Sequence, residues 1–179
     1  SANVTAASSF NLKADTLDPE RLLGYNAKYS RLFVSGGGMA VVNFLAATNY
    51  HHFWSPVDGR IVAAEQLAGL YVAGGDPCCV GDHRRAYVII ESEAFGTVAC
   101  VFVGMYDISN IVFAENVVVG AAVRKGEELG MFRYGGSEIV TLFEPGRVTL
   151  DEDVVKGGSW GGSTRNVGEK FGVRRLPRV

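Results

Sequence analysis

The sequence predicts an α+β fold dominated by β-structure, in which short strands form mostly antiparallel sheets and few short helices accompany them. Three observations lead to this prediction. Apolar runs are short and recur along most of the chain, glycine-containing turns separate them, and one segment carries a clear helix start signal. The chain has 179 residues, 47% hydrophobic and 20% charged, so it can bury the core of one compact domain.

The helix signal lies near the N-terminus. Asp18 can cap the helix, Pro19 fits its first position, and the helical pattern continues until Gly24. We expect the remaining apolar runs to form strands, because glycine turns divide them at short intervals. The expected strands cover residues 31–35, 39–46, 60–64, 86–91, 98–103, 117–123, 138–143 and 147–150. Their breaks are marked by Gly36-Gly37-Gly38, Asp58-Gly59, Gly74-Gly75-Asp76-Pro77, Gly96 and Pro145-Gly146.

The composition changes near residue 151, where core periodicity ends. We therefore divide the chain into a domain over residues 1–150 and a C-terminal arm or tail over residues 151–179. Trp160, Phe171 and Leu176 offer apolar contacts, so three arrangements are open: the tail docks on the body, it docks on another subunit of a homodimer, or it is solvated.

The charge balance argues against nucleic acid as a partner. With 17 basic and 19 acidic residues, the chain has no electrostatic footprint for it. No apolar stretch approaches the roughly 20 residues of a membrane helix, and residues 1–9 lack the basic-then-apolar order of a signal peptide. We therefore expect an intracellular, cytoplasmic protein. Arg174, Arg175 and Arg178, with Trp160, would allow peripheral contact with an anionic membrane.

The cysteines do not form a disulfide framework. Cys78 and Cys79 are neighbours and Cys100 lies alone in an expected strand, so the three cannot all pair. The adjacent pair also lacks the two-residue spacing of a zinc or redox motif. We expect reduced, structural thiols and no metal site.

Ser137 is the residue on which the function depends. It follows Gly135-Gly136 in a tight turn between two apolar runs, so its hydroxyl has little steric cover and can approach the carbonyl of Gly136. Two interpretations are open. Ser137 is either a turn serine that bonds its own backbone or a group that the protein converts into its own catalytic centre.

The histidines are the other candidates for chemistry, because histidine moves protons near neutral pH. The chain has three, and His51 and His52 adjoin each other while His83 stands alone. Side chains alternate along an extended segment, so His51 and His52 cannot both face one site. Either one is functional and the other peripheral, or both are ordinary histidines before a turn. A metal site would need more ligands than these.

A catalytic triad and a phosphate loop are poorly matched. Ser137, His51 and Asp58 provide the residue types of a serine–histidine–aspartate set, but Gly-Gly-Ser is not a nucleophile elbow. The glycines at 36–38 lack the Gly-Lys-Ser/Thr ending of a phosphate loop.

Four further motifs occur in a fixed order along the chain: Tyr50-His51, Ser55-Pro56-Val57-Asp58-Gly59, Phe102-Val103-Gly104-Met105 and Phe132-Arg133-Tyr134-Gly135-Gly136-Ser137. In this order they resemble the phosphatidylserine decarboxylase family, over roughly residues 30–150. The resemblance implies a fold of barrel-sandwich character and a catalytic domain over residues 1–150 that lacks the family's N-terminal part. Gly104-Met105 together with Gly-Gly-Ser is similar to a branch that decarboxylates aromatic amino acids.

The resemblance also implies a mechanism. Ser137 attacks the preceding carbonyl, the Gly136–Ser137 bond is cut autocatalytically, and the new N-terminus becomes a pyruvoyl group. That group would withdraw electrons from the bond to a carboxylate, which makes the protein a carboxy-lyase for an amino acid or, in phospholipid biosynthesis, for phosphatidylserine. His51 would protonate the resulting carbanion. The expected catalytic residues are Ser137, His51 and Gly136, and the expected substrate-binding residues are Tyr50, His52, Trp54 and Gly135.

Two positions depart from the family pattern. Asn49 stands where the family has an acid, and Trp54 stands where it has the histidine that serves self-cleavage. Because an indole cannot accept a proton, Trp54 cannot take over the role of that histidine. The alternative is therefore an unprocessed family member. Such a protein would bind a ligand or partner, or would act with His51 as a non-pyruvoyl enzyme of specialised metabolism.

Overall fold

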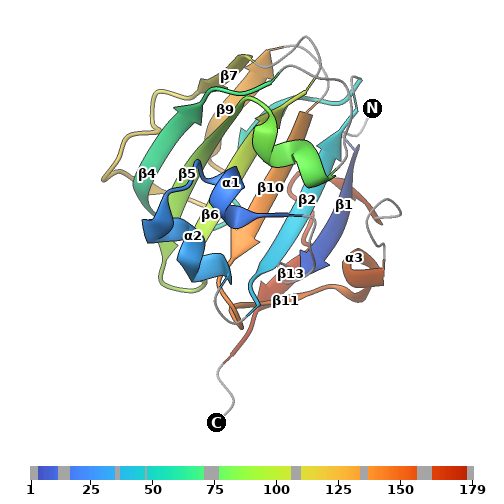
Figure 1. Cartoon of the computed structure of the whole chain (residues 1–179). Helices are drawn as coiled ribbons and strands as arrows, with labels where there is room; N and C mark the ends of the chain where they lie inside the picture. The colour runs from blue at the N-terminus through green and yellow to red at the C-terminus, as the bar shows by residue number, and fades with distance from the viewer. Residues whose placement is uncertain are drawn as a thin grey trace.

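Eight of the described strands form one antiparallel sheet that crosses the computed structural model (Figure 1). In spatial order they are β12 (Ser163–Asn166), β1 (Val4–Asn11), β2 (Met39–Leu45), β10 (Ser137–Phe143), β6 (Gly96–Gly104), β5 (Arg85–Ser92), β4 (Gly59–Leu67) and β8 (Ala122–Val123). The structure describes residues 4–11, 17–34, 37–46, 48–70, 77–105, 110–133, 137–156 and 163–176.

Two smaller sheets and four short helices complete the described structure. One sheet contains β3 (His52–Trp54), β9 (Glu128–Arg133) and β7 (Asn110–Phe113), and the other contains β11 (Val148–Leu150) and β13 (Gly172–Arg174). The helices are α1 (Pro19–Leu22), α2 (Ala27–Val34), the 3-10 helix η1 (Pro77–Asp82) and α3 (Glu152–Lys156). The predicted β-dominated α+β class is confirmed.

Both faces of the large sheet are covered. On one face Phe53 of β3 stacks on Phe102 of β6 with ring centroids 3.7 Å apart, and Phe132 of β9 packs beside them. On the other face Leu22 of α1 and Phe33 of α2 are buried in a second core. Because β5 and β6 are buried on both faces, they are nearly continuous apolar runs rather than alternating ones.

The predicted helix start is confirmed. The Asp18 side chain accepts a hydrogen bond of 2.9 Å from the main-chain nitrogen of Glu20, and Pro19 occupies the first helical position. Gly24 follows the helix with a φ of 62°, a conformation that glycine adopts without strain. Strands β2, β4, β5, β6, β10 and β11 form near the predicted positions.

Two predicted strands are wrong. Residues 31–34 belong to α2, because Tyr29, Ser30 and Phe33 are buried at helical spacing against the sheet. Of residues 117–123, only the last two join a strand. Val118 and Val119, just before this strand, are 57% and 60% exposed. They are apolar but not buried, so their side chains do not indicate a strand in the core.

The chain after residue 151 adds strands to the body. Strand β12 pairs with β1, strand β13 pairs with β11, and Phe171 packs against Phe143 with ring centroids 6.2 Å apart. Leu176 is 69% exposed, and Trp160 lies outside the described residues. Within the described ranges, the helices are all too short or too polar to cross a membrane.

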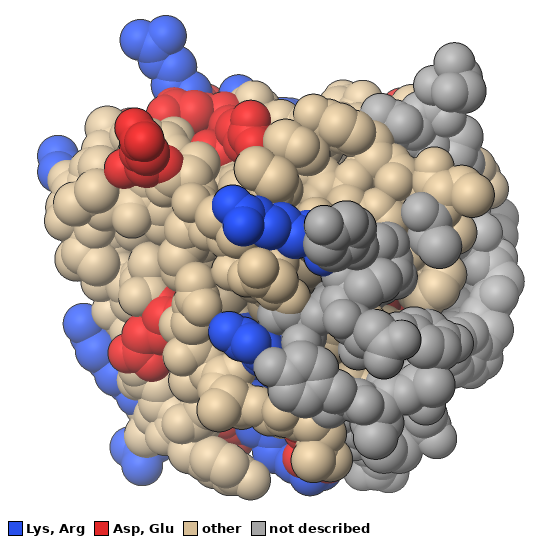
Figure 2. Space-filling model, turned by 90° about the horizontal axis from the view of Figure 1, so that it is seen from above, with Lys and Arg blue, Asp and Glu red and all other residues tan. Residues whose placement is uncertain are grey.

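Charged side chains on the face seen from above lie in small groups. Figure 2 shows several acidic side chains near one another at the upper left, while basic side chains lie near the middle and along the edges. The view agrees with the near balance of 17 basic and 19 acidic residues in the sequence.

Candidate active site

Ser137 is the first residue of β10 and is fully buried. It lies opposite Leu45 of β2 on one side and Gly104 of β6 on the other. Its Oγ has no hydrogen-bond partner among the residues that the structure describes. A buried hydroxyl without a partner costs ~1–3 kcal/mol, so this position suits a reacting group better than a turn serine that bonds its own backbone. Gly135 and Gly136 lie outside the described residues.

A cavity of about 540 Å³ lies on the face of the sheet to which Ser137 belongs. Side chains alternate along β10, so Ser137 shares this face with Ile139 and Thr141, which line the cavity. Their neighbours Leu45 and Asn43 on β2 line it too, and Leu45 is the direct partner of Ser137. Ser137 therefore lies at the end of the row of side chains that forms the cavity floor, but neither Ser137 nor His51 lines the cavity itself.

His51 is 8% exposed and is held by its neighbours. Its Nδ1 lies 2.7 Å from the main-chain oxygen of Asn49, and its ring meets Phe132 edge-on. Because a carbonyl oxygen only accepts hydrogen bonds, Nδ1 carries a proton. In the neutral ring Nε2 is then the basic nitrogen.

The chain brings His51 and Ser137 to the same end of the large sheet. A turn directly after Leu45 leads to His51, and in this turn Asn49 Oδ1 accepts a 2.7 Å hydrogen bond from the nitrogen of Ala46. The main-chain nitrogen of Phe132, shortly before Ser137, donates to the carbonyl of His51 over 2.8 Å. The side chain at position 49, where an acid was expected, thus closes a turn.

Tyr50, His52 and Trp54 form an aromatic ladder on the other side of the same segment. The Tyr50 and His52 rings are nearly parallel with centroids 4.3 Å apart, and Trp54 stacks 6.3 Å from His52. His52 Nδ1 lies 2.6 Å from Glu128 Oε1. His51 and His52 therefore face different surroundings, as the alternation of side chains predicted. Of the ladder, His52 and Trp54 line the cavity.

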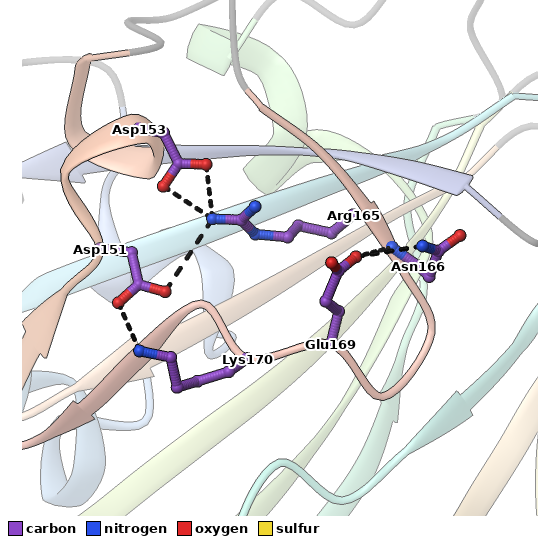
Figure 3. A network of polar contacts seen from close by, with 6 residues as sticks. All are labelled: Asp151, Asp153, Arg165, Asn166, Glu169 and Lys170. Carbon is purple, nitrogen blue, oxygen red and sulfur yellow. Dashed lines mark hydrogen bonds and ion pairs between the residues drawn. The ribbon is translucent and has the colours of Figure 1, made fainter.

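The C-terminal segment supplies the outer wall of the cavity, because residues 165–172 line it. An ion-pair network holds this wall, as Figure 3 shows. Arg165 Nη2 lies 2.6 Å from a carboxylate oxygen of Asp153 and 3.9 Å from one of Asp151, and Lys170 Nζ lies 2.9 Å from the other oxygen of Asp151. Glu169 Oε2 accepts a 2.6 Å hydrogen bond from the main-chain nitrogen of Asn166. Sequence reasoning placed this segment in a tail and gave it no part in the site.

The contacts of Asp58 and the burial of Cys100 give both residues a structural role. Asp58 Oδ1 accepts a 2.8 Å hydrogen bond from the main-chain nitrogen of Lys125, which braces the turn between β8 and β9 beside the cavity. Cys100 is buried, and burial raises the pKa of its thiol to about 12, so it stays protonated near neutral pH. The described residues contain no cluster of three or more histidine, cysteine or acidic side chains that could hold a metal ion.

Glu138 is a buried acid that the sequence did not single out. It is 4% exposed and lies on the opposite face of β10 from Ser137, with Phe44 and Val103 as its cross-strand neighbours. Its Oε2 has no hydrogen-bond partner in the described part of the chain. Burial raises its pKa to about 7. A glutamate at the start of a strand ordinarily indicates a solvated position, so the sequence offered no signal of this burial.

Comparison with known proteins shows the family to which the chain belongs. Residues 2–173 match the family model described as phosphatidylserine decarboxylase. The chain is 34% identical over 160 residues to phosphatidylserine decarboxylase proenzyme 3 of Schizosaccharomyces pombe, covering 86% of this chain and 16% of that protein. It is 33% identical over 142 residues to the proenzyme of Fusobacterium nucleatum, covering 75% and 47% of the two chains. It is 34% identical over 175 residues to decarboxylase iboD of Amanita muscaria, covering 83% and 49%.

These relatives are all named as decarboxylases, and the matched region includes the strand that begins at Ser137. The chain belongs to the phosphatidylserine decarboxylase family. The resemblance noted in the sequence is thereby confirmed. The chain spans about half or less of the length of these three relatives.

Proposed function

We propose that this chain carries the catalytic centre of a pyruvoyl-dependent carboxy-lyase, which removes CO2 from an amino acid or from phosphatidylserine. One observation carries the proposal. Ser137 is buried, its Oγ is unpaired among the described residues, and it begins a strand beside a cavity at the sheet end that also holds His51. The bond to be cut joins Gly136 to Ser137.

The surroundings of Ser137 suit a group made by chain cleavage. Strand β10 pairs with β2 and with β6 along its whole length, from Ser137 to Phe143. A cut before Ser137 would therefore leave the new N-terminus fixed between two strands. The unpaired, buried Oγ fits a hydroxyl that is consumed in the processing reaction.

The pyruvoyl group supplies a ketone that draws electrons from the bond between the substrate's Cα and its carboxylate. His51 holds a proton at Nδ1 against the oxygen of Asn49, so Nε2 is the nitrogen that exchanges protons with substrate. After CO2 has left, His51 would donate a proton to Cα, which takes up the electron pair of the broken bond. The buried position of His51 limits competition from water.

The aromatic ladder and the cavity define the substrate site. His52 and Trp54 line the cavity, and the Tyr50 ring stacks on both of them. A cavity of about 540 Å³ has the size of a small-molecule site. It accommodates an amino acid entirely, whereas the acyl chains of phosphatidylserine would have to extend beyond it. The names of the relatives support phosphatidylserine as the substrate, whereas the size of the cavity supports a free amino acid.

The test is the intact mass of the protein under denaturing conditions. The proposal expects two polypeptides that meet at Gly136 and Ser137, the second beginning with a carbonyl group that reacts with hydroxylamine. Ser137→Ala is the matched control and should remain one uncut chain. A wild-type protein that also remains uncut and unreactive would reject the pyruvoyl mechanism and favour the unprocessed, ligand-binding alternative. CO2 release from phosphatidylserine and from aromatic amino acids then distinguishes the substrates.

A further inference from the structure

A second cleft, of about 690 Å³, lies beyond the far end of β10 from Ser137. Its lining comes from α2, from residues 93–94 between β5 and β6, from residues 144–147 after β10, and from residues 174–175 at the end of β13. Strand β10 separates it from Ser137 by ~20 Å, at about 3.3 Å per residue. Among the described residues the two hollows share no lining residue. The cleft is therefore distinct from the proposed active site.

Positive charge dominates this second cleft. Four of its lining residues are arginines and two are glutamates. One arginine, Arg147, is paired with Glu144 over 3.1 Å. For Arg31, Arg174 and Arg175 no ion pair is formed with other described residues. In a chain with more acidic than basic residues, such a concentration of arginine is local rather than a consequence of composition.

The frame of the cleft is fixed by main-chain contacts. The nitrogen of Arg175 donates to the carbonyl of Arg147 over 2.9 Å, so the end of β13 is tied to the turn after β10. Glu144 Oε1 accepts a 2.9 Å hydrogen bond from the nitrogen of Thr97, which also holds the Arg147–Glu144 pair in place. Gly96 leaves room for that pair, because a Cβ there would lie 2.7 Å from Glu144 Oε2 and 2.9 Å from Arg147 Nε. The arginines therefore project from a braced rim.

We infer that this cleft binds a phosphate-type anion through Arg174, Arg175 and Arg31. The planar guanidinium group presents paired N–H donors that match two oxygens of a phosphate, and several arginines together can neutralise its charge. Arg147 stays with Glu144 and forms part of the wall. The volume of about 690 Å³ exceeds that of a phosphate ion, so the ligand can carry an organic group, as a soluble phosphate ester or a lipid phosphate does.

The binding experiment uses the complete, processed protein and two probes. Calorimetry with inorganic phosphate, at an ionic strength held constant with potassium chloride, measures soluble anion binding. Flotation with phosphatidylcholine vesicles, with and without phosphatidic acid, measures binding to a lipid phosphate. The test variant is the double substitution R174A/R175A. The control is R60A/R124A, which removes the same charge from exposed positions outside the cleft.

The proposal expects saturable binding to phosphate or to vesicles that contain phosphatidic acid. R174A/R175A should weaken it about ten-fold or more, while R60A/R124A stays within about two-fold of wild type. Phosphate binding identifies a soluble ligand, and binding confined to vesicles identifies a lipid. The inference is overturned if neither probe binds, or if both double variants lose binding equally. An unchanged melting temperature of R174A/R175A shows that the loss is local.

Discussion

The rings of His51 and Phe132 meet edge-on with centroids 6.3 Å apart, and the main-chain nitrogen of Phe132 donates to the carbonyl of His51 over 2.8 Å. His51 is thus attached to β9 through both its side chain and its backbone. Packing of this kind holds an imidazole in one orientation without fixing its charge, which suits a group that must gain and lose a proton.

The first prediction concerns His51→Asn. We expect the decarboxylation rate to fall by about 10²–10⁴-fold, because proton transfer to the substrate is lost. Cleavage before Ser137 and the melting temperature should change little, since asparagine can keep a hydrogen bond to the oxygen of Asn49. Turnover measures the loss of decarboxylation, and intact mass measured on the same preparation shows whether the chain is still cleaved. His52→Asn is the control and should affect KM more than kcat, because His52 belongs to the aromatic ladder that we propose binds the substrate.

The second prediction concerns the residues that depart from the family pattern. Trp54→His with Asn49→Asp restores a base and an acid at the two departing positions, so the cut fraction should rise if their absence limits processing. Trp54→Phe is the control, since it keeps an aromatic ring in the ladder but supplies no base. The cut fraction is followed by mass over time after synthesis. Equal cutting in all three proteins would mean that position 54 does not limit the reaction.

Much of the central sheet could be predicted because its signals are local. Strands β2, β5, β6 and β10 are apolar runs bounded by glycines or turns, and α1 begins with Asp18 and Pro19. The errors came where a short apolar run fits two structures. The run predicted as a strand over residues 31–35 is apolar enough for one, but packing of Phe33 in the core that contains Tyr87 selects a helix over residues 31–34.

The candidate site was predictable only in part. The order of motifs singled out Ser137 and His51 as candidates, and the alternation of side chains separated His51 from His52. The C-terminal wall was not predictable, because Arg165 and Phe171 carry no pattern that points to a cavity formed with β2 and β10. The burial of Glu138 was hidden for a related reason, since it depends on what covers the other face of the sheet.

The third prediction uses the raised pKa of Glu138. An acid whose pKa is higher in the folded than in the unfolded protein stabilises the fold while it is protonated. That contribution is complete below pH 4.5 and is lost as the pH rises to about 7, the pKa in the folded protein. The rise corresponds to an upper limit of ~3 kcal/mol. Denaturant unfolding between pH 5 and about 8 should therefore show falling stability in wild type and a flatter profile in Glu138→Gln. If stability falls with pH equally in wild type and in Glu138→Gln, Glu138 does not have a raised pKa in the folded protein.

The last prediction concerns the ion pairs that hold the outer wall of the cavity. Arg165, Asp151 and Asp153 are partly exposed, and pairs of this kind each contribute only ~0.2–1 kcal/mol. Asp153→Asn should therefore lower the melting temperature slightly but weaken substrate binding more clearly, because Arg165 lines the cavity. Salt at about 1 M reduces the Debye length to ~3 Å and so screens these ion pairs. It should therefore raise the KM of wild type to near that of Asp153→Asn, and it should raise the KM of the variant little further. Glu115→Gln, an exposed substitution away from the wall, should leave the salt response of KM as in wild type. If Asp153→Asn and Glu115→Gln respond to salt alike, the network does not hold the wall, and the cavity is shaped by the packing of Phe171 on Phe143 instead.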